Sequence, residues 1–152
     1  MSFSHPSGTR GATMPHGPVM RLVNRIATRR VRRTGGQSMG FDLLVLHTVG
    51  RKSGEERSTP LARFNAPDGS WFVVASANGS ADNPAWYLNM AAHPDQVSIE
   101  LDGQRFPVDV EELHGDDRTR AWDQITREIP RFNTYEERTD RQIPVIRLTR
   151  RG

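Results

Sequence analysis

Residues 41–64, FDLLVLHTVGRKSGEERSTPLARF, consist of an apolar stretch, a turn with a glycine at each end, and a second stretch of mixed polar and apolar residues. The first stretch, 41–49, is almost continuously apolar, which is typical of a buried strand. Residues 50–54 have the composition of a turn, and residues 57–64 are expected to form a second strand. Pro60 favours an edge position or a bulge for that strand, because proline donates no hydrogen bond to a sheet. The segment therefore predicts a hairpin within a β-rich fold.

The turn of this hairpin brings cations and hydroxyl groups together. Lys52 is the only lysine of the chain. Close to it in sequence are further cationic and hydroxyl side chains: Arg51, Ser53, Arg57, Ser58 and Thr59. Glycines let backbone N–H groups turn inward, and Lys and Arg donate charge-assisted hydrogen bonds, so the cluster suits an oxyanion such as a phosphate or a carboxylate. A solvated hairpin tip explains the same residues without a ligand, and both interpretations are open at this point.

The remaining chain alternates further strands with short helices. Strands are expected at 70–77, 97–101, 104–113 and 143–149, the middle two joined by a tight Asp102-Gly103 turn. Helices are expected at 85–93 and 114–129, the first opened by Pro84 and the second capped by Asp116 or Asp117, and residues 132–139 are expected to be a short helical or irregular piece. The first three strands are expected to form a meander. The whole predicts an α+β fold, a small barrel of about six mostly antiparallel strands with peripheral helices.

Charge is distributed unevenly along the chain. Seven arginines precede the first acidic residue, Asp42, which leaves −4 for the rest of a chain whose formal net charge is +3. Residues 1–17 are expected to be a disordered arm, and residues 18–152 a single domain that begins with a basic amphipathic helix over 18–33. That helix either packs on the domain or makes a peripheral contact with an anionic membrane. Nucleic-acid binding is not expected, because the acidic remainder has no interleaved basic and aromatic face.

Composition excludes several classes of chemistry. The chain has no cysteine, so disulfides, thiolate metal sites and cysteine nucleophiles are excluded, and no metal site is expected. No HExxH, P-loop or GxGxxG motif is present. No stretch approaches the roughly 18 apolar residues of a membrane span, and no secretory signal is recognisable, so we expect a cytoplasmic protein, membrane-associated if residues 18–33 bind lipid. An enzyme of this composition would take its chemistry from a cofactor.

A second segment, residues 73–90 (VVASANGSADNPAWYLNM), suits a planar ligand. Ala75, Ser76, Ala77 and Asn78 end a strand with small side chains, which leaves room for a ring to approach the backbone. Ser76 and Asn78 can also hydrogen-bond ring carbonyls or nitrogens. Trp86 and Asn89 follow on a helix, where Trp86 is either a core residue or a wall of the same groove.

These segments together resemble a known family. GRKSGEERSTPL (50–61), VVASANGSADNPAWYLNM (73–90) and the preceding VNRIATRRVRRTGGQSMGFDLLVLHT (23–48) are similar to the deazaflavin (coenzyme F420)-dependent nitroreductase and quinone reductase family. The likeness extends from about residue 19 to residue 148. It implies a split β-barrel, a homodimer, and hydride transfer from reduced coenzyme F420, an 8-hydroxy-5-deazaflavin, to an electron-poor acceptor such as a quinone, an enone or a nitroaromatic compound.

The resemblance also assigns residues. The cofactor's anionic tail would be held by Arg51, Lys52, Ser53 and Arg57. The ribityl and ring region would be lined by Ser58, Thr59, Pro60, Leu61, Ala75, Ser76, Ala77, Asn78, Ala85, Trp86 and Asn89. Tyr135 would be a wall of the substrate pocket or a proton donor.

Two residues depart from the family's pattern. His47 stands where a second threonine is expected, and Asn83 replaces a histidine that often precedes the proline. These departures leave the acceptor undecided. A split barrel that binds FMN, haem or another tetrapyrrole, with or without turnover, is the alternative.

Overall fold

The computed structural model describes residue 3 and residues 24–26, 28–29, 37–38, 41–76, 83–139 and 142–151. Within this part of the chain the strands are β1 (Gln37–Ser38), β2 (Phe41–Val49), β3 (Glu56–Ala62), β4 (Phe64–Asn65), β5 (Trp71–Val74), β6 (Ser98–Leu101), β7 (Gln104–Glu112) and β8 (Val145–Arg150). The helices are α2 (Ala85–Ala92), α3 (Gly115–Glu128) and α4 (Arg131–Arg138), and residues 24–26 and 28–29 are also helical.

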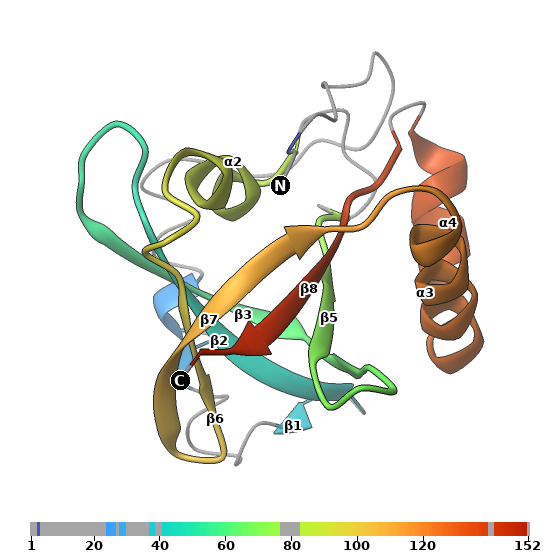
Figure 1. The fold of residues 1–152 in the computed structure, drawn as a ribbon, viewed down its shortest axis with the longest axis horizontal. Coiled ribbons are helices and arrows are strands. Elements are labelled where there is room, and N and C mark those ends of the chain that lie inside the picture. Colours follow the sequence, from blue (N-terminus) through green and yellow to red (C-terminus); the bar gives the residue numbers. More distant parts are fainter. Residues whose placement is uncertain are drawn as a thin grey trace.

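The strands form one curled sheet in the order β1-β2-β6-β7-β8-β5-β4 (Figure 1). The remaining strand, β3, is outside this order and also pairs with β2. Each pairing in the sheet is antiparallel. Apart from β1 and β4, which have two residues each, the strands are the six that the sequence predicts. The expected split β-barrel with peripheral helices is confirmed.

The barrel interior is filled by side chains that alternate along the strands. In β7, Phe106, Val108 and Val110 point inward and are buried, whereas Pro107 and Asp109 between them are exposed. This alternation follows from the two-residue period of a strand. Figure 1 shows α2 across one end of the barrel, and its Trp86, Tyr87 and Met90 belong to the same core.

A second core lies on the other side of β5 and β8, where α3 and α4 stack beside the sheet (Figure 1). Val145 and Ile146 are neighbours in β8 but belong to different cores, because successive side chains of a strand point to opposite faces. From α3, Ala121, Trp122 and Ile125 enter this second core. Both faces of β8 are therefore buried at its first two residues, Val145 and Ile146, which are apolar.

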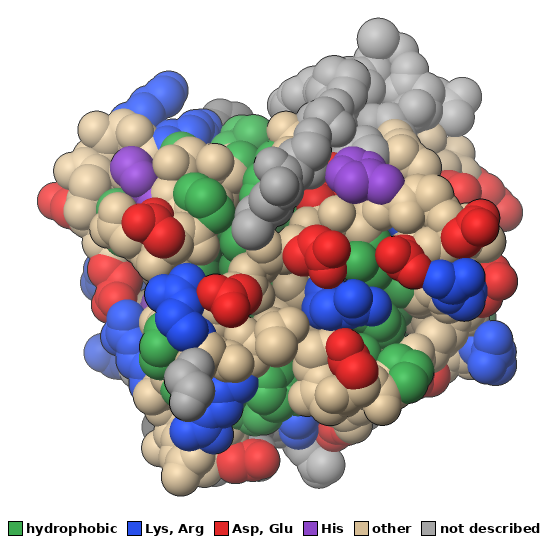
Figure 2. Space-filling view, in the orientation of Figure 1, with side chains coloured by type: hydrophobic (Ala, Val, Ile, Leu, Met, Phe, Trp, Pro, Cys, Tyr) green, Lys and Arg blue, Asp and Glu red, His purple; other side chains and the backbone are tan. Residues whose placement is uncertain are grey.

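Charged side chains of both signs alternate on the face drawn in Figure 2, where β7 and β8 lie in front. Arg147 Nη1 lies 3.4 Å from Glu111 Oε1, and Arg151 Nε lies 3.0 Å from Asp109 Oδ1. These pairs join the two strands across their exposed face. Exposed pairs of this kind contribute at most about 1 kcal/mol each, so the barrel core dominates the stability of this region.

The turns follow the sequence expectations. Asp102 and Gly103 have φ angles of 51° and 79°, as the tight turn between β6 and β7 requires. Pro84 precedes α2, and Pro60 lies in β3, an edge strand of the described sheet. Both proline interpretations are confirmed.

Two expectations are wrong. The stretch 57–64 is not one strand: it breaks at Arg63, whose N–H donates to Asp42 O (2.9 Å), and β4 then turns toward β5. The expected meander is nevertheless present, because β3 pairs with β2 and β4 pairs with β5, both antiparallel. Neither Asp116 nor Asp117 caps α3, because the helix begins earlier, at Gly115, and leaves both carboxylates inside its positively polarised first turn.

The expectations for the N-terminal region fall mostly outside the described residues. Within the expected helix 18–33, Thr28 is buried while Arg25 and Ile26 are exposed, and Asn24 Nδ2 lies 3.5 Å from Thr59 Oγ1 of β3. In the arm 1–17, only Phe3 is described. No helix in the described part of the chain is both long and apolar enough to cross a membrane.

Candidate functional site

The turn between β2 and β3 projects beside α2 (Figure 1). Gly50 N donates to Glu55 O (2.7 Å) and Gly54 N to Gly50 O (2.9 Å), which closes the turn. Gly54 has a φ of 72°, where a side chain is disfavoured, and a Cβ at Gly50 would lie 2.6 Å from Ser53 Oγ. The path of the backbone that carries Arg51 and Lys52 therefore favours glycine at 54, and a side chain at 50 would displace the Ser53 hydroxyl.

Arg51 ties this turn to α2. Its backbone N and its Nη1 each lie 3.1 Å from Oδ1 of Asn89. Asn89 is only 5% exposed, so its carboxamide is a fixed acceptor and not a surface group. The structure thus brings together two residues that the sequence assigned to one ligand from separate segments.

Arg57 and Ser53 form the other side of the turn. Arg57 Nη2 lies 3.3 Å from Ser53 Oγ, and its Nη1 donates to Glu55 Oε2 (3.1 Å). Ser53 Oγ also accepts from the N–H of Glu55 (3.1 Å). Lys52 is exposed at the tip. Two cations, Arg51 and Lys52, are therefore presented on the exposed turn, and a third, the half-buried Arg57 of β3, bonds to it and already contacts the carboxylate of Glu55.

The residues that follow the turn are divided between the two faces of β3. Thr59 pairs with Leu46 and Leu61 with Leu44, and both leucines point into the barrel core. Ser58 pairs with His47 on the opposite face, as does Pro60 with Val45. Because side chains alternate along a strand, Arg57, Thr59 and Leu61 share the inner face, and Ser58 and Pro60 the outer face.

The second predicted segment meets the first at the barrel core. Ala75 is fully buried, and its N–H donates to Pro144 O (3.0 Å); Trp86 is 6% exposed and packs in the same cluster. Leu61 borders that cluster, Ser76 is partly exposed and Ala85 is exposed. Trp86 is thus a core residue, and its predicted contact with a ligand stays a prediction. Ala77 and Asn78 lie outside the described residues.

Tyr135 belongs to a different cluster. It lies on α4 at the border of the second core, with its ring edge-on to Phe132 at 5.3 Å between centroids. Trp86, Ala75 and Leu61 belong to the barrel core or its border. The described contacts therefore group Tyr135 apart from the other predicted residues, and its role in a substrate pocket stays a prediction.

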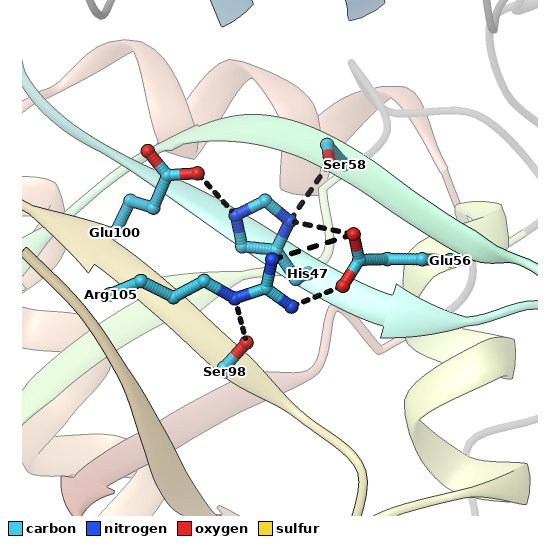
Figure 3. A network of polar contacts seen from close by, with 6 residues as sticks. All are labelled: His47, Glu56, Ser58, Ser98, Glu100 and Arg105. Carbon is cyan, nitrogen blue, oxygen red and sulfur yellow. Dashed lines mark hydrogen bonds and ion pairs between the residues drawn. The ribbon is translucent and has the colours of Figure 1, made fainter.

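A polar network centred on His47 was not predicted from the sequence (Figure 3). His47 is buried and contacts Glu100 and Ser58, and beside it Arg105 pairs with Glu56. Glu56 is the first residue of β3 and pairs with Arg105. Alternation places Glu56 and Ser58 on one face, but the strand neighbours that complete the network depend on sheet order.

Electrostatics at this network is governed by burial and by one ion pair. Burial lowers the pKa of His47 below its ordinary value of 6.5, although its hydrogen bond with Glu100 acts in the opposite direction. The hydrogen bond from Arg105 lowers the pKa of Glu56. At neutral pH the imidazole is therefore neutral beside ionised Glu56. Among the described residues, no group of three or more metal-binding side chains is arranged to hold an ion.

Comparison with known proteins agrees with this geometry. The family model described as F420H(2)-dependent quinone reductase matches residues 19–150. The chain is 42% identical over 112 residues to an F420H(2)-dependent quinone reductase of Mycobacterium tuberculosis, with 71% of this chain and 73% of that protein covered.

Two solved structures are similar to the fold. One is an F420-H2 dependent reductase, FDR-A, with a TM-score of 0.62 and 34% identity over 70% of this chain and 92% of that one. The other is a domain-swapped dimer, with a TM-score of 0.63 and 30% identity over 87% and 99% of the two chains. The chain belongs to the F420H(2)-dependent quinone reductase family.

Proposed function

We propose that this protein catalyses the reduction of a quinone by reduced coenzyme F420, giving the hydroquinone and the oxidised cofactor. The observation that carries the proposal is the cationic turn that the bonds between Arg51 and Asn89 hold against α2. Such a turn presents fixed positive charge beside the apolar end of the barrel, which suits a ligand with an anionic tail and a planar ring.

The anionic tail of the cofactor would lie on Arg51, Lys52 and Arg57. Guanidinium groups donate two parallel hydrogen bonds to a phosphate or a carboxylate, and Lys52 adds an exposed point charge. Arg51 keeps further N–H donors beyond the one that Asn89 accepts. The donor set therefore fits a phosphate followed by glutamyl carboxylates, and Ser53 and Thr59 add hydroxyl donors nearby.

The ring region would lie where β3, β5 and α2 meet. Leu61, Ala75 and Trp86 provide an apolar wall, and Ser76, Ala77, Asn78 and Ala85 are proposed to complete it. An apolar wall excludes water and orients a planar group, which brings a donor and an acceptor to about 3–3.5 Å. When bound, reduced coenzyme F420 supplies the hydride, so the protein needs neither a metal nor a nucleophile of its own.

Tyr135 is proposed as a wall of the acceptor pocket or as the donor of the proton that accompanies the hydride. Only the second role requires its phenolic O–H, which can donate one hydrogen bond. Full turnover by the Tyr135→Phe variant would leave it as a wall only. Enones and nitroaromatic compounds are further candidate acceptors, because both accept a hydride at an electron-poor centre.

Assembly and location are also proposals. A homodimer is supported by the similarity to the domain-swapped dimer, and light scattering on the purified protein would measure the mass. A cytoplasmic enzyme that touches a membrane through residues 18–33 would reach a lipid quinone directly. If a variant lacking residues 1–33 pelleted with anionic liposomes as well as the full chain does, that membrane contact would be ruled out.

The proposed reaction is tested by following oxidation of reduced coenzyme F420 with a short-chain quinone as acceptor. We expect turnover that depends on both substrates and that falls on charge removal at Lys52. Absence of both turnover and F420 binding would contradict the proposal and would make FMN and haem the next ligands to titrate.

A further inference from the structure

Six polar side chains form a connected network on the outer face of the sheet (Figure 3). This His47 network consists of His47 on β2, Glu56 and Ser58 on β3, Ser98 and Glu100 on β6, and Arg105 on β7. The strand register pairs His47 with Ser58 on one side and with Ser98 on the other. The preceding residue on β2, Leu46, belongs to the barrel core, so the network lies on the face away from it.

His47 is the centre of the network and is only 3% exposed. Its Nε2 lies 2.6 Å from Glu100 Oε1, and its Nδ1 lies 2.8 Å from Ser58 Oγ. Because a carboxylate only accepts, Nε2 carries the proton and donates to Glu100. In the neutral ring Nδ1 then accepts from the Ser58 hydroxyl. One neutral imidazole thus bonds to both strands that flank β2.

An ion pair and a further hydrogen bond, both made by Arg105, cross the same strands. Arg105 on β7 donates to the carboxylate of Glu56 on β3, and its Nε donates to Ser98 Oγ (3.1 Å). In the sheet, β2 and β6 lie between β3 and β7. The ion pair therefore spans two intervening strands and draws the first residue of β3 toward the body of the sheet.

These ties matter because β3 is an edge strand in the described sheet, paired through its backbone with β2. Backbone pairing on one side leaves an edge strand freer than a central one, so side-chain bonds across its face contribute more to its position. β3 follows the cationic turn directly and carries Arg57 and Thr59 on its inner face. A shift of β3 would move both residues and the turn.

Building on the function proposed above, we propose that His47 is a positioning residue of the cofactor site. Its neutral imidazole, bonded to Ser58 and Glu100, holds β3 where Arg57 and the turn receive the anionic tail. His47 itself touches neither cofactor nor substrate, since it lies on the outer face.

Protonation of His47 changes its hydrogen bond with Ser58 and the ion pair between Glu56 and Arg105. The charged groups that face the imidazole in the described part of the chain are Glu100 on β6, Glu56 on β3 and Arg105 on β7. An imidazolium donates from both nitrogens, so Nδ1 stops accepting from Ser58 and becomes a donor. Glu56 Oε2, 4.0 Å from Nδ1, is then attracted to it in competition with Arg105. The outer bonds of β3 therefore depend on pH.

The experiment compares two substitutions at His47 in the full-length protein. His47→Gln keeps a donor for Glu100 and an acceptor for Ser58 but cannot be protonated, and His47→Leu removes both bonds at similar volume. Asp109→Asn is the control, because Asp109 lies on the same outer face but pairs with Arg151. Coenzyme F420 is titrated by fluorescence at pH 8 and pH 5.5, and hydrogen exchange of amides 56–62 is measured at one fixed pH without ligand.

We expect His47→Leu to weaken F420 binding about five- to tenfold at pH 8 and His47→Gln to bind within about twofold of the parent, since one or two net hydrogen bonds are at stake. Acidification should weaken the parent more than His47→Gln. The cofactor's own titration affects both proteins equally. The change in the ratio of their Kd values between pH 8 and pH 5.5 therefore reports the effect of protonating His47. Asp109→Asn should follow the parent.

Hydrogen exchange separates failure of this inference from failure of the proposed function. Faster exchange of amides 56–62 in His47→Leu, with amides 145–150 of β8 unchanged, supports the positioning role even if no protein binds F420. Unchanged exchange in β3 overturns it, as does unchanged F420 affinity in a folded His47→Leu variant.

Discussion

The carboxamide oxygen of Asn89 accepts from both the backbone N–H and the guanidinium of Arg51, each at 3.1 Å. A helix residue thus fixes the conformation of a turn that is far from it in sequence. One buried oxygen accepts two hydrogen bonds from Arg51 and so fixes the position of its guanidinium. The remaining N–H groups of that guanidinium can still donate to a ligand. The proposed anion site is therefore preorganised by α2 and not by the hairpin alone.

Asn89→Ala should release the turn while leaving α2 intact, because alanine favours helix. We expect F420 affinity to fall about tenfold and stability to fall by about 1–3 kcal/mol, the usual effect of removing one partner from buried hydrogen bonds. Titration and urea unfolding measure the two effects. Unchanged affinity in the folded variant would show that Arg51 needs no anchor.

Gly54→Ala should weaken ligand binding through the backbone. Gly54 has a φ of 72°, so a side chain there costs about 1–2 kcal/mol. Gly69 has a φ of 88° in the turn before β5, and a Cβ added at either glycine would meet no atom within 4 Å. Gly69→Ala is thus a matched control with a similar loss of stability. Only Gly54→Ala should reduce F420 affinity, and equal affinities in the two variants would argue against a turn-specific effect.

Stability should decrease as the solution is acidified from about pH 6.5. Burial lowers the pKa of His47, so the folded protein keeps a neutral ring while the unfolded chain takes up a proton near its ordinary value of 6.5. The contribution is complete above that pH and is lost as pH falls through the lower, folded-state pKa. Glu56, whose pKa is also lowered, acts only in a more acidic range, below 4.5. Urea unfolding should show a shallower slope between pH 6.5 and 5 for His47→Gln, and identical slopes would refute the assignment.

Glu55→Gln should strengthen F420 binding. Glu55 Oε2 lies 3.1 Å from Arg57 Nη1 and competes with a ligand carboxylate or phosphate for the same guanidinium. The pair is exposed on the Glu55 side (71%), so the gain should be modest, about two- to fivefold. Asp102→Asn removes the same charge from the distant β6–β7 turn and serves as the control. A gain of equal size in both variants would indicate net charge and not local competition.

The sequence predicted the strands well because their signals are local. Alternation in 104–113 and the turn Asp102-Gly103 depend on neighbouring residues, and the structure has both. The break at Arg63 was missed, because a run of residues compatible with a strand gives no sign that Phe64 and Asn65 will leave β2 and pair with Phe72 and Trp71 of β5. The cap of α3 was missed because His114 occupies a position that Asp or Ser usually takes.

The residue types of the site were predictable from the sequence, but the contacts between residues of different strands and helices were not. Lys52 and its neighbours were recognised from their residue types, and the link between Arg51 and Asn89 follows from packing α2 beside the turn. The His47 network required the order of β3, β2, β6 and β7, which no local pattern contains. Burial of Trp86 likewise depends on how α2 sits across the barrel end, since an aromatic residue at that spacing is compatible with core and ligand roles alike.

The central claim is that the turn of β2 and β3 binds the anionic tail of coenzyme F420. Its most direct test is a fluorescence titration of the full chain and of Lys52→Ala with oxidised F420 at moderate and high salt. We predict micromolar binding that salt weakens, and that falls at least severalfold with a shallower salt dependence in Lys52→Ala. Binding that is indifferent to both salt and Lys52, or no binding at all, would contradict it.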